Sequence, residues 1–162
     1  MTFEGLRNFD QRMRQVLPPQ DGISPHITGQ YGEKRKGRRP HGGIDFNYNV
    51  PGQRGINLDH PTVNSPVDGK VEFVGGNYGT VKIRTSDGYS HEILHLHTTN
   101  VRKDDLVEVG QAIGTMGGRG PTKATEYAQH VHYQLKDSED RIVDPKEYFE
   151  NEDKKQTDST KP

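Results

Sequence analysis

The stretch QHVHY, residues 129–133, places two histidines on either side of a single valine. In a β-strand, side chains two residues apart leave the same face of the sheet, so His130 and His132 should point to one side. The same spacing occurs at His95 and His97 in the stretch ILHLH, and His91 is in phase with them, so these side chains should also share one face. A lone histidine needs only a surface position or one hydrogen bond to explain it, but two such pairs in 162 residues indicate a shared task.

A third element lies upstream in PHGGID, residues 40–45. His41 and Asp45 are four positions apart and would converge on one ion if Gly42 and Gly43 let the chain curl before the next strand. The sequence has no cysteine, so any metal must be held by nitrogen and oxygen. Three such ligands, with a fourth position left to water, are typical of catalytic zinc. One histidine of each pair would then be free to move a proton or to stabilise charge.

Length and composition predict one β-rich domain. The 162 residues suit a single domain, and the 19 glycines and 10 prolines favour turns and short strands over long helices. Alternating apolar residues predict an α+β, β-rich fold with a mainly antiparallel sheet. Strands are expected in the segments 44–50, 67–76, 79–86, 89–98, 106–118 (as two short strands) and 131–137. The segment 23–43 and the turn-rich insertion within 47–64 are expected to be irregular.

The two ends of the chain differ in character. Phe3, Leu6, Phe9, Met13 and Val16 are three or four positions apart, which predicts an amphipathic helix that ends before Pro18 and Pro19. We therefore expect residues 1–19 to form a helix packed on a domain of residues 20–149, which closes with a short helix. Residues 150–162 have the composition of a disordered tail.

The charge pattern limits the classes of partner. The formal net charge is −1, and no nucleic-acid-binding motif is present, so no nucleic-acid partner is expected. No segment has the length and apolar character of a membrane span or of a secretory signal. The basic run 34–39 is interpreted as a solvated loop, with a patch for an anionic partner as the alternative.

The order of these motifs resembles the lysostaphin/LytM-type zinc metallopeptidases, which are peptidoglycan endopeptidases. HGGIDF resembles the family's first ligand motif, GYSHEILHL its histidine-bearing strand and QHVHYQL its later H-x-H strand. ITGQYG, SPVDGKVEFVG and VGQAIGTMG resemble the segments around them, so that the resemblance covers residues 27–148. The chain departs from the family pattern at KATEYAQ, before His130, and in the longer segment 47–64. Both would line the substrate groove and affect substrate preference.

The resemblance implies a role for each matching residue. His41, Asp45 and His132 would bind one catalytic Zn²⁺, and His95 and His130 would be the catalytic histidines. The resemblance assigns no role to His97. The remaining histidines, His26, His60 and His91, are given ordinary structural explanations.

The implied activity is zinc-dependent hydrolysis of peptide bonds in peptidoglycan cross-links or stem peptides. We expect a monomer that acts at the cell wall, in the periplasm or outside the cell. Without a signal in this sequence, it would arrive by phage lysis, by a non-classical route, or after removal of a leader. The alternatives are a catalytically inactive wall-binding or regulatory relative, and a barrel of the biotinyl/lipoyl kind, because SPVDGKVEFV and VEVGQAIG also resemble such barrels.

Overall fold

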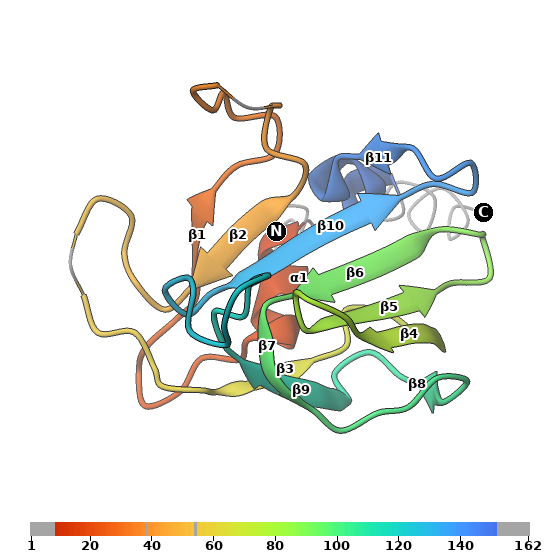
Figure 1. Cartoon of the computed structure of the whole chain (residues 1–162), viewed down its shortest axis with the longest axis horizontal. Coiled ribbons are helices and arrows are strands. Elements are labelled where there is room, and N and C mark those ends of the chain that lie inside the picture. Colours follow the sequence, from red (N-terminus) through yellow and green to blue (C-terminus); the bar gives the residue numbers. More distant parts are fainter. Residues whose placement is uncertain (1–8, 38, 54, 152–162) are drawn as a thin grey trace, which may run out of the picture.

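The computed structural model describes residues 9–37, 39–53 and 55–151 (Figure 1). Helix α1 (Phe9–Val16) precedes the strands, and a second helix occupies residues 145–151. The strands are β1 (His26–Gly29), β2 (Ile44–Asn47), β3 (Thr62–Asn64), β4 (Gly69–Gly75), β5 (Thr80–Arg84), β6 (Ser90–Leu94), β7 (Leu96–Thr99), β8 (Leu106–Val107), β9 (Ala112–Met116), β10 (Val131–Lys136) and β11 (Ile142–Val143).

The strands form two antiparallel sheets. The larger sheet has the order β1-β2-β10-β6-β5-β4-β8, with β11 paired to β10, and the smaller sheet has the order β3-β9-β7. The predicted fold class, β-rich with a mainly antiparallel sheet, an N-terminal helix and a short C-terminal helix, is therefore confirmed.

Side-chain alternation divides the large sheet into a core face and a site face. On β10, Tyr133 is fully buried and the adjacent His132 is partly exposed. On β2, Phe46 is fully buried and the adjacent Asp45 is partly exposed. Because successive side chains of a strand point to opposite faces, His132 and Asp45 lie on the face opposite the core.

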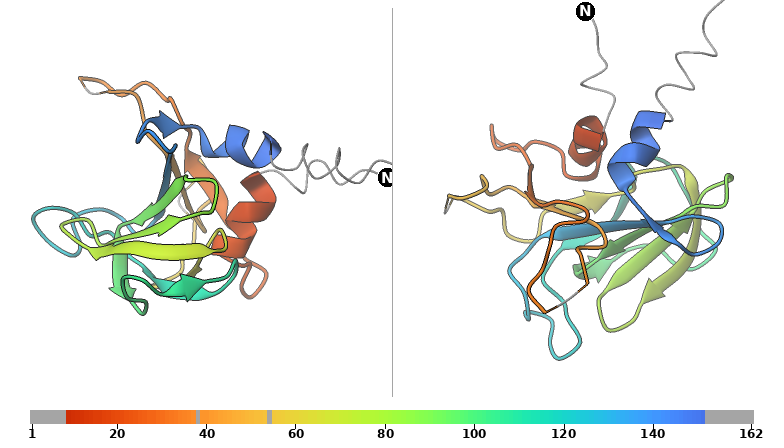
Figure 2. Two further views of the ribbon diagram at one scale, coloured as in Figure 1. Left: turned by 90° about the vertical axis from the view of Figure 1, so that its right-hand side faces the viewer. Right: turned by 90° about the horizontal axis from the view of Figure 1, so that it is seen from above.

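The helices cover the core face and leave the site face to loops. Phe9 and Met13 of α1 are buried, and the ring of Phe9 packs against Phe46 and Tyr133 with centroids 5.9 and 5.6 Å apart. Figure 2 shows both helices on one side of the sheet, with the loops 30–43 and 117–130 on the other. No helix among the described residues combines the length and apolar character that crossing a membrane requires.

Two features differ from the expectation. Strands β1 and β3 lie in segments predicted to be irregular, because each is short and gains its order from pairing, with β2 and β9 respectively. The strand expected over 89–98 is divided in two at His95. The predicted boundaries 1–19, 20–149 and 150–162 stay a prediction, since residues 1–8, including Phe3 and Leu6, and residues 152–162 lie outside the described part of the chain.

Candidate metal centre

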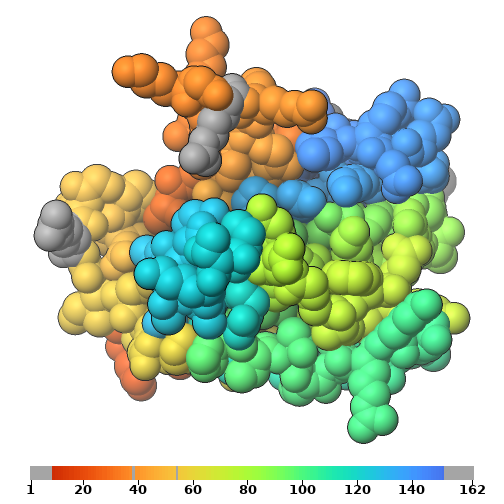
Figure 3. Space-filling view, viewed as in Figure 1, coloured from red at the N-terminus to blue at the C-terminus, as the bar shows by residue number. Residues whose placement is uncertain are grey.

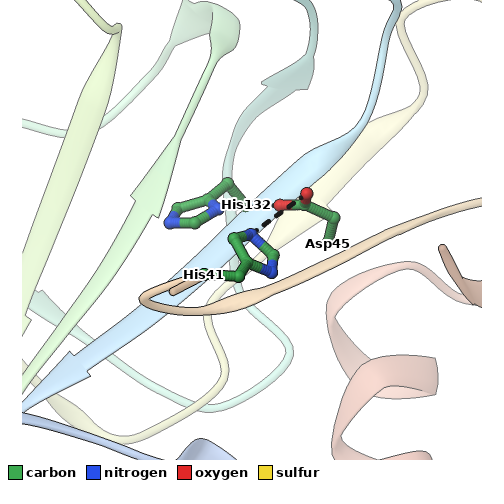
Figure 4. Close-up of side chains that lie close together, drawn as sticks. All are labelled: His41, Asp45 and His132. Atoms are coloured by element: carbon green, nitrogen blue, oxygen red, sulfur yellow. Dashed lines mark hydrogen bonds and ion pairs between the residues drawn. The ribbon is translucent and has the colours of Figure 1, made fainter. Parts of the chain in front are cut away.

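His41, Asp45 and His132 come together on the site face of the large sheet (Figure 4). Asp45 of β2 and His132 of β10 are directly opposite each other in the antiparallel register, and His41 lies in the loop before β2. One ligand atom of each residue lies within 4.8 Å of the other two. Figure 3 shows that the segments coloured orange and cyan, which include the loops 30–41 and 117–130, stand out on either side of this part of β10.

The loop before β2 holds the His41 ring in place. Its backbone is closed by hydrogen bonds from Gly32 N to His41 O, 2.8 Å, and from His41 N to Glu33 O, 2.9 Å. The ring donates from Nδ1 to the carbonyl oxygen of Gln30 at 2.8 Å and is almost completely buried. Nε2 is thereby directed toward Asp45, whose Oδ2 lies 3.2 Å away.

Gly43 is required by close packing and not by an unusual backbone angle. A Cβ at this position would lie 2.5 Å from the carbonyl oxygen of Tyr133 and 2.9 Å from Nε2 of His132. Neither Gly42 nor Gly43 has a positive φ. At Gly43 it is therefore the absence of a side chain, and not a positive φ, that lets the loop approach β10.

The donor atoms fit a small divalent cation. The carbonyl oxygen of Gln30 can only accept, so in neutral His41 the hydrogen is on Nδ1 and Nε2 presents a lone pair to Asp45. This lone pair and a carboxylate oxygen, 3.2 Å apart, repel each other unless positive charge lies at the same place. Among the described residues this group contains three possible ligands, two nitrogens and a carboxylate, which leaves an open position as in catalytic zinc sites.

Asp45 remains ionised at any physiological pH. Burial by itself raises the pKa of its carboxyl, but the side-chain hydrogen bond with His132 and the electrostatic interactions with His132, His130 and His41 lower this pKa to about 2. The guanidinium of Arg35 adds to this effect, because its Nη2 lies 3.5 Å from Oδ2. A carboxylate in this state is ready to bind a metal without first losing a proton.

Two further histidines lie beside the metal centre. Nε2 of His130 is 3.8 Å from Oδ1 of Asp45, and the ring centroids of His95 and His130 are 4.6 Å apart. Nδ1 of His95 donates to the carbonyl oxygen of Arg119 at 2.7 Å, and Nδ1 of His130 donates to that of Ala128 at 2.8 Å. In both rings Nε2 is therefore the nitrogen that can exchange a proton. Burial lowers the pKa of His95 to about 4, so this ring is neutral near pH 7.

The arrangement of these residues along the chain matches a known family. The model of Peptidase family M23 matches residues 39–145, more than half of the chain. This chain belongs to peptidase family M23. The matched range includes the three candidate ligands as well as His95 and His130, and the resemblance to the lysostaphin/LytM-type peptidases is confirmed.

Individual relatives match parts of the chain to different extents. The cell division protein DipM of Caulobacter vibrioides (strain NA1000 / CB15N) is 28% identical in an alignment over 100 residues that covers 56% of this chain and 16% of DipM. A zinc-containing peptidase from Vibrio cholerae has a TM-score of 0.60 at 28% identity, covering 78% of this chain and 37% of that chain. The chain thus spans a minor part of both proteins.

The catalytic domain of a third protein is similar over almost its whole length. This is the antimicrobial peptidase lysostaphin from Staphylococcus simulans, with a TM-score of 0.56 at 24% identity. The similarity covers 80% of this M23 chain and 93% of that domain, and shows that the two share a fold.

The backbone at His95 interrupts the alternation of side chains that a continuous strand from His91 to His97 would have. His91 faces the core, where it is fully buried and its Nδ1 lies 2.5 Å from the hydroxyl of Tyr133. His95 has a φ of 68°, in the left-handed region, which ends β6 and turns the imidazole to the site face. The prediction that His91 and His95 lie in phase on one face is therefore wrong, whereas the ordinary structural explanation of His91 holds.

His97 lies away from the metal centre. Its ring stacks on that of His60 with centroids 3.8 Å apart and an interplanar angle of 16°. His60 is held by a hydrogen bond between Nδ1 and the carbonyl oxygen of Met116, 2.8 Å long. The two histidines of the HLH motif thus belong to different clusters, and His26 begins β1.

Two tyrosines near His95 were not identified from the sequence. The rings of Tyr127 and Tyr78 lie 5.2 and 6.1 Å from the His95 ring, in edge-on geometry, and both residues are exposed. Tyr127 belongs to KATEYAQ, the segment in which the sequence departs from the family pattern. That departure was the available signal, but no spacing rule connects Tyr127 or Tyr78 with His95.

Proposed function

We propose that this M23 chain is a zinc-dependent endopeptidase that hydrolyses peptide bonds in the cross-links or stem peptides of peptidoglycan. The observation that carries the proposal is the convergence of His41, Asp45 and His132 within 4.8 Å. The adjacent pair His95 and His130, with centroids 4.6 Å apart, supplies the groups for proton transfer.

The chain's own atoms indicate how one zinc ion would be held. His41 would bind through Nε2, His132 through Nδ1, and Asp45 through its carboxylate, because these atoms face one another. When bound, zinc would supply a Lewis acid for the scissile carbonyl and lower the pKa of a bound water to about 7.

His95 and His130 are proposed to divide the proton chemistry. The stretch HEILH, residues 91–95, has the H-E-x-x-H spacing, but it lies on strand β6 instead of a helix and His91 is fully buried, so it does not supply a glutamate base of that kind. Through Nε2, one imidazole would accept the proton of the attacking water, and the other would donate a hydrogen bond to the developing oxyanion. An unperturbed imidazole pKa of about 6.5 suits proton transfer near neutral pH.

The relatives support the choice of substrate and place of action. Lysostaphin is an antimicrobial peptidase and DipM is a cell division protein, and a substrate in the cell wall is consistent with both descriptions. We propose action at the cell wall by a monomer, on either a glycine–glycine bridge or a D-alanine linkage. The alternative of a biotinyl/lipoyl barrel is not pursued, because the chain belongs to family M23.

The proposal is tested by digesting two purified peptidoglycans of different cross-link chemistry with the zinc-loaded protein. Mass spectrometry of the soluble fragments should show new peptide ends in at least one of them, and a chelator should prevent their formation. Protein that contains one zinc ion per chain but leaves both peptidoglycans and glycine-rich peptides intact would favour the inactive, regulatory alternative.

A further inference from the structure

A buried acidic residue lies behind His132 and has no part in the proposed metal centre. Glu92 is only 2% exposed and lies on β6, where it pairs in register with Gln134 of β10. Its Oε1 accepts a hydrogen bond from Nε2 of Gln134 at 2.6 Å. A buried carboxylate is stable only when paired or hydrogen-bonded, and here Nζ of Lys136 and Nζ of Lys82 lie 3.6 and 3.9 Å from its Oε2.

Gln134 connects this carboxylate to His132. Because an ionised carboxylate only accepts hydrogen bonds, the amide NH₂ of Gln134 must face Glu92, and its Oε1 must face Nε2 of His132, 3.0 Å away. That amide oxygen also only accepts, so Nε2 of His132 must carry a hydrogen. With zinc bound the ring has a single hydrogen, and Nδ1, which lies 2.7 Å from Oδ1 of Asp45, is then the nitrogen whose lone pair faces the ion.

We propose that Glu92 and Gln134 are positioning residues that hold His132 in the tautomer and orientation that zinc binding requires. The inference rests on the zinc site of the proposed function but not on peptide hydrolysis. Hydrogen-bond partners of metal-bound histidines typically contribute about 10–100-fold to metal affinity or activity.

The two histidine ligands differ in how their orientation is fixed. His41 donates to a backbone carbonyl, that of Gln30, which no side-chain substitution removes. His132 depends on the side chains of Gln134 and Glu92, which substitution can remove one at a time. The arrangement around His132 is therefore open to direct testing.

A purely structural role for the pair makes a different prediction. Cross-strand side-chain pairs stabilise a sheet by about 0.2–1 kcal/mol each. If the contact between Gln134 and Glu92 did no more than this, its loss would lower the melting temperature. The tautomer of His132 and the affinity for zinc would not change.

The test measures the tautomer and the zinc affinity separately. Side-chain ¹⁵N NMR of the zinc-free protein should show a hydrogen on Nε2 of wild-type His132, and Gln134→Met should shift this hydrogen to Nδ1, the nitrogen that faces the Asp45 carboxylate. Competition with a chelator should show zinc binding by Gln134→Met weakened about 10–100-fold. The same chemical change at Gln111, whose Oε1 accepts from the backbone N of Glu108 in a distant turn, should alter neither.

A double exchange guards against simple misfolding. Glu92→Gln combined with Gln134→Glu restores an acceptor for His132 and a donor to that acceptor, so the tautomer and most of the zinc affinity should return. An unchanged tautomer with zinc affinity within about threefold of wild type in Gln134→Met would overturn the inference. If the double exchange failed to restore either property, the proposed connection would also be overturned. Wild-type protein that binds zinc but cuts no peptide would refute the proposed function and leave this inference standing.

Discussion

Replacing Gly43 with alanine should weaken the fold and the metal centre, whereas the same change at Gly42 should not. The new Cβ at Gly43 would lie 2.5 Å from the carbonyl oxygen of Tyr133 and 2.9 Å from Cε1 and Nε2 of His132. At Gly42, the first contact would be with Cδ1 of Ile142 at 3.4 Å, which is an ordinary van der Waals distance. The two adjacent glycines therefore provide a matched pair.

The two substitutions are expected to change the free energy of unfolding in different directions. The carbonyl of Tyr133 cannot move easily, because Tyr133 pairs with Ile44 in the ladder between β10 and β2. Overpacking of this kind costs about 1–3 kcal/mol, so Gly43→Ala should lower the free energy of unfolding of the zinc-free protein by that amount. Where the backbone and the space suit alanine, a glycine-to-alanine change stabilises by about 0.4–1 kcal/mol, so Gly42→Ala should be neutral or slightly stabilising.

Urea unfolding in the presence of a chelator measures the change in the free energy of unfolding for both variants. Gly43→Ala should also weaken zinc binding, measured by chelator competition, because the new methyl group displaces His132 from its ligand position. The affinity should fall about tenfold for each 1.4 kcal/mol that returning His132 to this position costs. Equal unfolding free energies and equal zinc affinities for the two variants would refute the reasoning, because the loop would then have room for a side chain at Gly43.

Other side chains give outcomes of different kinds. Changing His95 or His130 to alanine should reduce peptide hydrolysis by about 10²–10⁴-fold and leave the zinc content of the purified protein unchanged; loss of the metal would contradict their separate placement. Asp45→Asn should lose zinc on dialysis, because the carboxylate faces both histidine ligands, and retention of one ion per chain would argue against this site. Burial lowers the pKa of His91 from 6.5 to about 3. Between these two pH values the unfolded chain binds a proton at His91 that the folded chain does not bind, so the free energy of unfolding should fall as the pH decreases from 6.5 toward 3. In His91→Phe, the slope of the unfolding free energy against pH should be smaller by up to about 1.4 kcal/mol per pH unit, and the remaining slope would include the contribution of His95. An unchanged slope would show that burial does not lower the pKa of His91.

The centre of the site was predictable because strand geometry is regular. At the start of β10, a period of two is enough to place His130, just before the strand, and His132 on one side, and both do face Asp45. The sequence also predicted a mainly antiparallel β-rich fold, since apolar alternation is a local signal.

The arrangement around His95 was not predictable by the same rule. A period of two from His91 would place His95 in the core, but one residue with a φ of 68° reverses the direction of the side chain. Histidine tolerates this backbone region better than most residues, yet nothing in the local sequence requires it. Strands β1 and β3 were missed for a related reason, because their order comes from pairing with β2 and β9.

Contacts that depend on strand register also could not be predicted from the sequence. Glu92 and Gln134 are 42 positions apart, and only the pairing of β6 with β10 brings them opposite each other. Without that register, nothing in the sequence connects Glu92 with His132. The sequence thus predicts side chains that share a face, whereas their neighbours on adjacent strands require the structure.

The most direct test of the account is anomalous diffraction at the zinc edge from crystals of the zinc-loaded protein. The account predicts one peak per chain, about 2.0–2.2 Å from Nε2 of His41, Nδ1 of His132 and a carboxylate oxygen of Asp45. A peak elsewhere on the chain, or none in protein that contains stoichiometric zinc in solution, would contradict it.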